Sequence, residues 1–513
     1  MATTAFLILQ SPRPALADGV VDIAAGNFHA CAVLADGGVK CWGYNLFAQI
    51  GDGTSGDFAR TTPVDVCQTY DEETATCAEP LTGIAHIAAS FLHTCVVTGA
   101  GGVKCWGNNL GGQLGVEEAE ACPGAVLDSS SRCARTPVDV AGLPLGVRSV
   151  AAGNLHTCAV IEDGSAYCWG TNVTGELGDG TTMSTSTPVQ VNTEEQIVEI
   201  AAGRHHTCAL TTNGTVLCWG DGTMGRLGNI PAESCPGFWV GDPTPCSTVP
   251  RPVCAEHGQN PGECERQLQD VTAISAGGSN TCTLTSTQSV ACWGIDGSGF
   301  LGAETEDMCV SSLPHSDPVA CASTPLEVTG LRGEATAIDV GGLFHSCAVT
   351  VGGGLKCWGN NFVGSLGDGS EEDRPAPVGV LEDVGGSLMS GVADVASGWL
   401  FACALNTSGA VKCWGSNCCG QHGNGEQDFD AHPYPTDVSG FEPKTLPVVL
   451  GDVNCDGAVT SVDAALILQL EAGLIAALPC PANGDLSGDG SVDSIDAALI
   501  LQFTAGLAGS LPR

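Results

Sequence analysis

The chain has 513 residues, of which 17 are Lys or Arg and 57 are Asp or Glu, so its formal net charge is −40. Neutralising phosphate requires clustered Lys and Arg, so this charge argues against a nucleic-acid-binding protein and against docking onto an anionic membrane. A hydrophobic content of 43% is too high for a disordered chain, and the sequence has no apolar run long enough for a transmembrane helix.

The 28 cysteines indicate a disulfide framework formed in an oxidising compartment, and therefore a secreted protein or one on the extracellular surface. Export requires a signal peptide. Residues 1–19 contain an apolar stretch at 4–9 and then Ala15-Leu16-Ala17, which is typical of a cleavage site. No Lys or Arg precedes the apolar stretch, so an ordinary N-terminus is the alternative interpretation of residues 1–19.

One sequence pattern occurs seven times within residues 20–440, with a period of about 62 residues. Each copy has an Ala-Ala-Gly-like turn, His-x-Cys, a polar turn, Cys-Trp-Gly, a glycine cluster and a Pro-Val strand. No segment here has a sustained helical period, so the copies read as short strands joined by glycine turns. Such units cannot bury both faces alone. Radial packing of seven of them predicts a mainly β fold, a seven-bladed β-propeller.

The two cysteines of each copy lie ten residues apart, on either side of a predicted hairpin turn. Opposed positions of a hairpin have Cα atoms about 4.5 Å apart, within reach of a disulfide. A zinc site needs four ligands, and two Cys and one His per copy supply only three. We therefore predict one cross-strand disulfide per blade: Cys31–Cys41, Cys95–Cys105, Cys158–Cys168, Cys208–Cys218, Cys282–Cys292, Cys347–Cys357 and Cys403–Cys413.

A histidine recurs at one position in five copies: His29, His93, His156, His206 and His345. Asn280 and Phe401 occupy this position in the other two copies, and phenylalanine does not suit a catalytic or metal-binding ring. We interpret the imidazoles as groups that hydrogen-bond to the backbone between strands or blades, and the seven Cys-Trp-Gly tryptophans as core anchors between blades. Asp52 and the other Gly-Asp-Gly aspartates are interpreted as turn residues.

The pattern Gly-x-x-His-Thr/Ala/Ser-Cys … Cys-Trp-Gly-x-Asn-x-x-Gly-Gln-Leu-Gly resembles the regulator of chromosome condensation repeat, in its alpha-tubulin suppressor-like bacterial type. The resemblance covers residues 20–440 and implies a seven-bladed propeller. The chromatin-binding role of the founding member is not implied, because the charge and the disulfides do not suit it. Secreted bacterial members are binding proteins, which implies a scaffold that recognises a protein or a glycan.

Insertions lengthen some repeats, and each carries a predicted disulfide: Cys67–Cys77, Cys122–Cys133, Cys235–Cys246, Cys254–Cys264 and Cys309–Cys321. Cys67 and Cys254 follow a Pro-Val strand, whereas the other three pairs precede one, so equivalent loops are expected on a common rim. Phe238 and Trp239 are the predicted aromatic anchors for a partner; stiffened decoration is the alternative. Adjacent Cys418 and Cys419 fit either a vicinal disulfide or a packing feature.

A second module follows a linker at residues 441–450. Within residues 451–513 two segments, 463–474 and 496–507, are identical at ten of twelve positions, and each follows an acidic loop with Gly457 or Gly490 at position 6. A twelve-residue loop supplies calcium with oxygens from positions 1, 3, 5, 7, 9 and 12. The predicted ligands of two calcium ions are Asp452, Asn454, Asp456, Ala458 (backbone), Thr460 and Asp463, and Asp485, Ser487, Asp489, Ser491 (backbone), Asp493 and Asp496.

The module thus combines two calcium loops with one helix after each, and Cys455 is predicted to pair with Cys480. This arrangement resembles the type I dockerin family over residues 451–513. The resemblance implies a cohesin-type partner or attachment to the cell surface, with loop positions 10 and 11 helping to choose the partner: Ser461, Val462, Ser494 and Ile495. Many dockerins carry a basic pair later in the helix, where this chain has Leu468-Gln469 and Leu501-Gln502. A calcium-stabilised cap on the propeller is the alternative.

These features predict a secreted, non-catalytic binding protein whose propeller recognises a target and whose calcium module attaches it. The alternatives are a polysaccharide hydrolase or lyase, since dockerins often accompany those enzymes, and an inhibitor or adhesin. No paired-carboxylate or nucleophile motif supports an enzyme.

Overall fold

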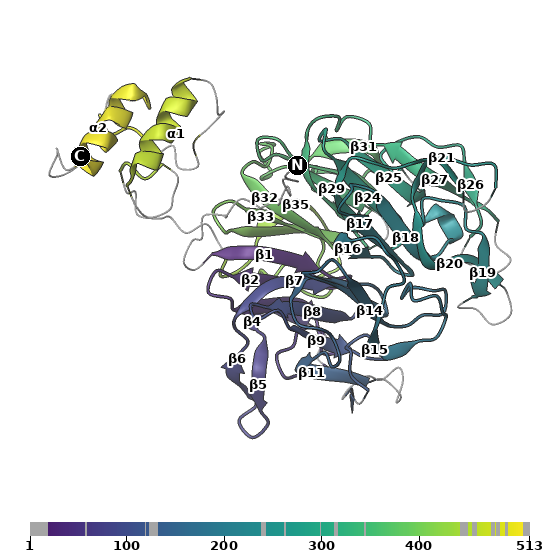
Figure 1. Ribbon diagram of the computed structural model, residues 1–513. Helices are drawn as coiled ribbons and strands as arrows, with labels where there is room; N and C mark the ends of the chain where they lie inside the picture. The colour runs from purple at the N-terminus through teal and green to yellow at the C-terminus, as the bar shows by residue number, and fades with distance from the viewer. Residues whose placement is uncertain are drawn as a thin grey trace.

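The computed structural model describes two stretches of the chain (Figure 1). The first covers residues 19–441, apart from 57–58, 118, 123–131, 238–242, 261–262, 298, 312–316 and 343–344. The second covers residues 450–505, apart from 454–458, 473–477, 479–482 and 488–490.

Seven antiparallel sheets follow one another along the described part of residues 19–441, and each is one predicted blade. Blades 1 to 3 consist of β1 (Val20–Ala25), β2 (His29–Leu34), β3 (Val39–Tyr44) and β4 (Ala59–Asp65); β7 (Ile84–Ala89), β8 (His93–Thr98), β9 (Val103–Asn108), β10 (Glu120–Ala121) and β11 (Arg132–Asp139); and β12 (Val147–Ala152), β13 (His156–Ile161), β14 (Ala166–Gly170) and β15 (Thr185–Gln190). Blades 4 and 5 consist of β16 (Ile197–Ala202), β17 (His206–Thr211), β18 (Val216–Asp221), β19 (Glu233–Pro236) and β20 (Pro243–Pro252); and β23 (Val271–Ala276), β24 (Asn280–Thr285), β25 (Val290–Ile295), β26 (Met308–Cys309) and β27 (Val319–Glu327). Blades 6 and 7 consist of β28 (Ala335–Val340), β29 (His345–Thr350), β30 (Leu355–Gly359) and β31 (Arg374–Gly379); and β32 (Val392–Ser397), β33 (Phe401–Asn406), β34 (Val411–Ser416) and β35 (Ala431–Asp437).

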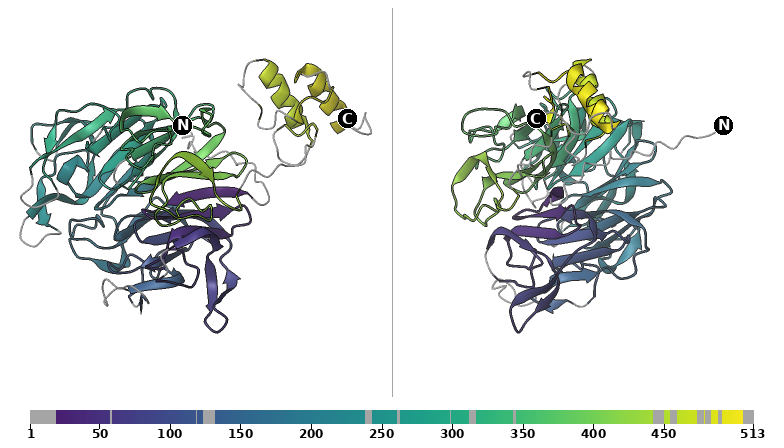
Figure 2. Two further views of the ribbon diagram at one scale, coloured as in Figure 1. Left: turned by 180° about the vertical axis from the view of Figure 1, so that it is seen from behind. Right: turned by 90° about the vertical axis from the view of Figure 1, so that its left-hand side faces the viewer.

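The blades are arranged radially (Figures 1 and 2). The first strand of each blade contacts the first strands of its two neighbours, and β32 of the last blade packs against β1 to close the ring. Every blade is built from consecutive strands, so the ring closes through contacts between blades 7 and 1 and not through a sheet that they share. The predicted seven-bladed propeller is confirmed.

The hydrophobic core lies between neighbouring blades rather than within them. In one cluster, Cys31, Val33 and Cys41 of blade 1 pack against Ile87 and Trp106 of blade 2. The alternation of side chains along each strand places apolar residues on both faces of a blade, because both faces are covered by neighbours. Each interface between two blades, here called a seam, therefore carries its own part of the core.

Two insertions form hairpins of their own, β5 (Cys67–Asp71) with β6 (Thr76–Pro80), and β21 (Cys254–His257) with β22 (Cys264–Gln267). A short 3-10 turn, η1 (Thr223–Gly225), follows β18. As predicted, the other insertions precede the outer strands: β10, β19 and β26 pair with β11, β20 and β27.

The C-terminal stretch contains the two predicted helices, α1 (Ser461–Glu471) and α2 (Ser494–Thr504). They pack against each other around a small core that includes Val453, Ile467, Leu486 and Ile500. Each helix has a capping box, formed by Thr460 with Asp463 in α1 and by Asp493 with Asp496 in α2. The duplicated sequence thus folds into duplicated local structure.

Candidate functional site

Each blade contains one disulfide, as predicted. Cys31 of β2 pairs with Cys41 of β3 across the hairpin, and the same register recurs in the other six blades. The Cα atoms of these pairs lie 4.0–4.1 Å apart, and the cysteines are buried. The blade cysteines therefore hold the middle of each sheet together and are removed from solvent.

The recurrent histidines link neighbouring blades through side chains. His29 Nε2 lies 2.8 Å from Thr94 Oγ1 of the next blade, and the Thr94 hydroxyl donates to the backbone carbonyl of Gln49 at 3.0 Å. Since that hydroxyl proton points to the carbonyl, Thr94 Oγ1 accepts from His29 Nε2–H. We expected a backbone partner for these imidazoles. For four of the five imidazoles the direct partner is instead a threonine hydroxyl of the next blade. Three of these threonines, Thr94, Thr157 and Thr207, in turn donate to a backbone carbonyl.

The same carbonyl also anchors a tryptophan. Trp106 Nε1 donates to Gln49 O at 2.9 Å, so both acceptor sites of this oxygen are used at one seam. Equivalent tryptophan bonds join five further seams, with acceptor oxygens on Gln113, Glu176, Arg226, Ser365 and Gln421. The tryptophans are core anchors between blades, as interpreted from the sequence.

One exception in the histidine position, Phe401, is matched by its partner on the next blade. The histidine–threonine pairs are His29–Thr94, His93–Thr157, His156–Thr207 and His206–Thr281. At the seam between blades 7 and 1, Phe401 replaces histidine and Ala30 replaces threonine, and both belong to one apolar cluster. The imidazole and the hydroxyl that would accept its hydrogen bond are thus absent together at this seam. A threonine directly after the histidine position in blades 2 to 5 was the sequence signal for this link, and our sequence-based prediction missed it.

The insertions contact neighbouring blades at the rim. Arg135 of blade 2 donates to Glu72 of the β5–β6 hairpin at 2.7 Å and to Glu120 at 3.4 Å, which joins two insertions. His257 of the β21–β22 hairpin lies 3.1 Å from Ser323 Oγ of blade 5. The five insertion cysteine pairs are bonded as proposed from their spacing. Phe238 and Trp239 lie outside the described residues.

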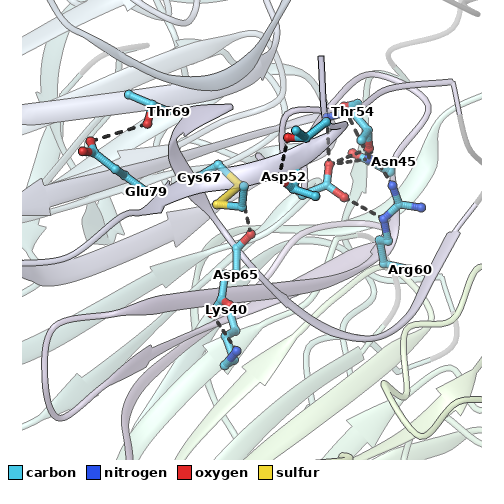
Figure 3. The surroundings of a disulfide bond; sticks show 12 residues. Lys40, Asn45, Asp52, Thr54, Arg60, Asp65, Cys67, Thr69 and Glu79 are labelled. Atoms are coloured by element: carbon cyan, nitrogen blue, oxygen red, sulfur yellow. Dashed lines mark hydrogen bonds and ion pairs between the residues drawn. A yellow bond between two sulfur atoms is a disulfide. The ribbon is translucent and has the colours of Figure 1, made fainter. Parts of the chain in front are cut away.

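Asp52 lies in a turn, near the disulfide of the first insertion (Figure 3). Its carboxylate accepts from the backbone N–H of Thr54 at 3.0 Å and from Arg60 Nε at 2.6 Å. Figure 3 also shows Lys40 Nζ paired with Asp65, two residues before Cys67, at 2.6 Å. These contacts fix the turn and the start of the insertion. They give both Asp52 oxygens a protein partner, so the carboxylate does not need a metal ion.

The C-terminal module places equivalent aspartates at equivalent points. Asp463 Oδ1 accepts from the N–H of Val453 at 3.0 Å and Oδ2 from the N–H of Thr460 at 2.8 Å, so one carboxylate ties the beginning of the loop to its end. Asp496 does the same in the second loop, accepting from Leu486 at 2.8 Å and from Asp493 at 3.0 Å. Both carboxylates are fully buried, at 0% exposure.

The donor set of both loops suits a hard cation. Carboxylate, hydroxyl, amide and backbone oxygens make up the predicted ligands, with no nitrogen or sulfur, and this is the chemistry that calcium selects. Asp452 at position 1 of the first loop is also buried, at 3% exposure, and Asn483 Nδ2 donates to its backbone oxygen at 2.7 Å. Burial of a carboxylate is costly unless hydrogen bonds or a nearby cation compensate it, so these positions suit a divalent cation.

Some expected ligands cannot be placed. Positions 454, 456, 458 and 489, and the Cys455–Cys480 pair, lie outside the described residues. Among the residues described, no group of three or more His, Cys, Asp or Glu side chains has an arrangement that could hold a metal ion. No described helix is long and apolar enough to span a membrane.

The predicted partner-binding residues lie on the exposed faces of the two helices. Val462 and Ile495 are each 55% exposed, and Ser461 and Ser494 beside them are also exposed. Six residues later, about 1.7 turns along each helix, Leu468 and Leu501 are exposed by 42% and 43%. The two helices thus present the same short apolar surface, although each already buries an apolar face against the other helix.

Family models match both parts of the chain. Two models described as the regulator of chromosome condensation (RCC1) repeat match residues 100–160 and 163–210, and residues 20–49, 84–113, 147–176, 197–226 and 392–421. A model described as the dockerin type I domain matches residues 450–503. A dockerin type I domain implies calcium binding by this module.

Known proteins are similar to this chain. The ultraviolet-B receptor UVR8 of Arabidopsis thaliana is 29% identical over 412 residues, which is 79% of this chain and 67% of that protein. Protein pim1 of Schizosaccharomyces pombe is 29% identical over 178 residues, and the match spans 33% of this chain and only 30% of pim1. The crystal structure of yeast RCC1 (Prp20) bound to Kap60 is 19% identical, covers 85% of this chain and 91% of that chain, and has a TM-score of 0.57, which shows a shared fold. The chain is a seven-bladed β-propeller of RCC1 repeats followed by a dockerin type I domain.

Proposed function

We propose that the chain is a secreted, non-catalytic binding protein. Its propeller recognises a protein or glycan target, and its dockerin module attaches it, in the presence of calcium, to a cohesin-type partner. We divide the chain into an N-terminal segment 1–19, the propeller 20–440, a linker 441–450 and the module 451–513. The duplicated exposed face of α1 and α2 is the observation that carries this proposal.

That face has the features of a docking surface that can be used in two orientations. Ser461-Val462 and Ser494-Ile495 begin the two helices at equivalent positions, and an exposed leucine follows each pair. An exposed apolar surface on so small a module is costly unless a partner covers it. Because the two faces differ only by valine against isoleucine, a partner that fits one also fits the other after a half rotation.

Calcium supports this role by fixing the helices that carry the face. Asp463 and Asp496 are each both the last predicted ligand of a loop and part of the capping box of the following helix. A bound ion supplies charge neutralisation to these buried carboxylates, and the loops then hold the starts of both helices. Two ions, one per loop, follow from the duplicated ligand pattern.

The propeller supplies a rigid scaffold for recognition. Its seams are closed by buried hydrogen bonds and its blades by buried disulfides, which favours loops held in defined positions. The disulfides also support export, because buried cross-strand disulfides form in oxidising compartments.

The test is capture of recombinant type I cohesin modules by the full-length chain, with calcium and with a chelator. We expect capture with calcium and none with chelator. Val462→Asp alone and Ile495→Asp alone should each keep most of the binding, because the other face remains, whereas the double variant should lose it. Binding that survives the double variant, or that ignores the chelator, contradicts the proposal.

Surface variants Leu145→Asp and Val384→Asp are matched controls, since both side chains are exposed on the propeller, each by 81%. They should leave cohesin capture unchanged. A loss of capture in these controls would place the docking surface on the propeller instead of on the module.

A further inference from the structure

Two adjacent cysteines of blade 7 stand apart from the other described cysteines. Cys418 and Cys419 are half-buried in the segment between β34 and β35, and neither is bonded, whereas twelve disulfides account for the other cysteines of the described residues. Their sulfur atoms face each other, with Sγ to Sγ 2.9 Å apart. Two thiols at this separation are placed to react with each other.

The surrounding amides fix this pair in position. Gln421 Oε1 accepts from the N–H of Cys419 at 2.8 Å, and Gln421 Nε2 donates to Cys418 Sγ at 3.5 Å. Gln427 Nε2 donates to the backbone oxygen of Cys418 at 2.8 Å. The backbone of both residues is therefore held by side-chain amides, and Cys418 Sγ has two neighbours that can donate to it, Gln421 Nε2 and the Cys419 thiol.

The same donors favour the thiolate of Cys418. A hydrogen bond from the Cys419 thiol, and a weaker one from Gln421, lower the pKa of Cys418, while the same contact and burial raise the pKa of Cys419. The thiolate is the nucleophile in thiol–disulfide exchange. Cys418 is thus the attacking residue of the pair and Cys419 the resolving one.

We propose that Cys418 and Cys419 are a redox modification site that closes reversibly into a vicinal disulfide by exchange with a small-molecule disulfide such as oxidised glutathione. The thiolate of Cys418 attacks one sulfur of the small disulfide, which releases one small thiolate and leaves a mixed disulfide on Cys418. Cys419 then gives up its proton and attacks Cys418 Sγ, and the second small thiolate leaves. The two cysteines lose two electrons, and the two released thiols carry away the electrons and both protons.

The position of the pair gives this step a consequence at the surface. Burial raises the pKa of the Tyr44 hydroxyl, and negative charge on the cysteine pair raises it further, so Tyr44 lies within electrostatic range of the two sulfurs. Tyr44 packs against Phe28 with ring centres 5.9 Å apart, and Phe28 also contacts Phe91 and Trp399. Oxidation replaces a thiolate and a thiol by an uncharged ring of low polarity beside this half-buried aromatic cluster, which joins blades 7, 1 and 2.

The pair differs from the blade disulfides in access. The blade cysteines are buried, so a reductant reaches them only after a sheet opens, whereas Cys418 and Cys419 are partly exposed. A vicinal bond also closes no loop of the chain. Its opening therefore releases little unfolded-state entropy and leaves the propeller folded.

The test is alkylation of the full-length chain with N-ethylmaleimide after equilibration in glutathione buffers of different ratio, followed by peptide mapping without reduction. In oxidised glutathione we expect no label on the peptide with Cys418 and Cys419, and a mass two hydrogens below that of the dithiol. In reduced glutathione we expect two labels there and none on Cys403 and Cys413 of the same blade. The variants Cys418→Ser and Cys419→Ser each keep only one cysteine of the pair, so neither variant should form the ring.

Several outcomes overturn the proposal. They are two labels at every glutathione ratio, a stable glutathione adduct without a ring, a cross-link from either cysteine to another part of the chain, or a ring that opens only in denaturant. Each is distinguishable by mass from the expected pair of states.

Discussion

The propeller and the C-terminal module are stabilised in opposite ways. The stabilising contacts of the propeller are spread over seven seams, each with buried tryptophan, cysteine and apolar side chains. The described part of the module has one small cluster of seven buried apolar residues, together with buried aspartates. A core of that size supplies little free energy, so we expect the module to depend on a ligand and the propeller to depend on its own packing. Removal of a ligand should therefore destabilise mainly the module, and removal of internal bonds should destabilise mainly the propeller.

Chelation of calcium is expected to have the largest effect, and only on the module. At a free calcium concentration a thousandfold above Kd, binding adds about 4 kcal/mol to the folded state, and a small core cannot replace that amount. Hydrogen exchange should show loss of protection in α1 and α2 with unchanged protection in the blade strands. Protection of both helices in chelator would show that the module is stable without calcium.

Single-residue variants sharpen this prediction. Asp485→Ala removes a predicted side-chain ligand and should weaken calcium binding at least tenfold by calorimetry, whereas Ser491→Ala keeps the predicted backbone ligand and should leave affinity unchanged. Equal effects of the two variants would contradict the assignment of loop positions 1 and 7.

Removal of a blade disulfide is the corresponding test of the propeller. Cys158–Cys168 and Cys67–Cys77 both close loops of the same length, with a sequence separation of 10. Replacing Cys158 and Cys168 by Ala should lower the free energy of unfolding by about 2–3 kcal/mol, measured by denaturant with tryptophan fluorescence.

Replacing Cys67 and Cys77 by Ala is the matched control. It should loosen only the β5–β6 hairpin, because that hairpin is mostly exposed, and it should show as faster proteolysis there with little change in the global midpoint. Equal global losses in both variants would mean that the insertion carries as much stability as the blade.

Acid should weaken the propeller through its seams. Burial lowers the pKa of four seam histidines, to about 3 for His29 and His93 and to about 4 for His156 and His345. In the unfolded chain each imidazole takes up a proton near pH 6.5, whereas in the folded chain it stays neutral down to pH 3–4. The free energy of unfolding therefore falls as the pH drops from 6.5 towards 3–4. Each such histidine contributes a slope of about 1.4 kcal/mol per pH unit in that window.

Buried acids oppose this trend over part of the window. Burial raises the pKa of Glu176 and Glu199 to about 7. Their contribution to the free energy of unfolding therefore grows as the pH falls towards 4.5 and is lost as the pH rises through 7. We therefore expect the steepest loss of propeller stability below pH 4.5, measured by denaturant midpoints at stepped pH. His93→Asn should flatten the slope, since Asn280 occupies the equivalent position in blade 5. A slope unchanged in this variant would contradict the role of the imidazole.

The two regions also differ in what their sequences revealed. Seven copies of a pattern with a fixed cysteine spacing predicted the blades and their disulfides, because covalent geometry leaves few ways to place Cys31 opposite Cys41. The calcium module was predicted from the chemistry of its oxygen ligands and the duplicated helix. The hydroxyl partner of the histidines was not predicted, because Thr94 contacts His29 only after two blades pack together. The exposure of Leu468 and Leu501 likewise depends on how α1 and α2 pack, which their apolar composition does not reveal.

The smallest predicted effect tests the seam itself. Thr157→Val keeps the shape of the side chain but removes the hydroxyl that joins His93 Nε2 at 2.9 Å to Gln113 O at 2.8 Å. A buried imidazole N–H then lacks a partner, which should cost about 1–3 kcal/mol in the free energy of unfolding. Combining His93→Phe with Thr157→Ala copies the Phe401–Ala30 seam, and because both polar partners leave together it should cost less than the sum of the two single variants. Strict additivity of the two changes would show that this histidine and this threonine act independently, and that the seams are held by apolar packing alone.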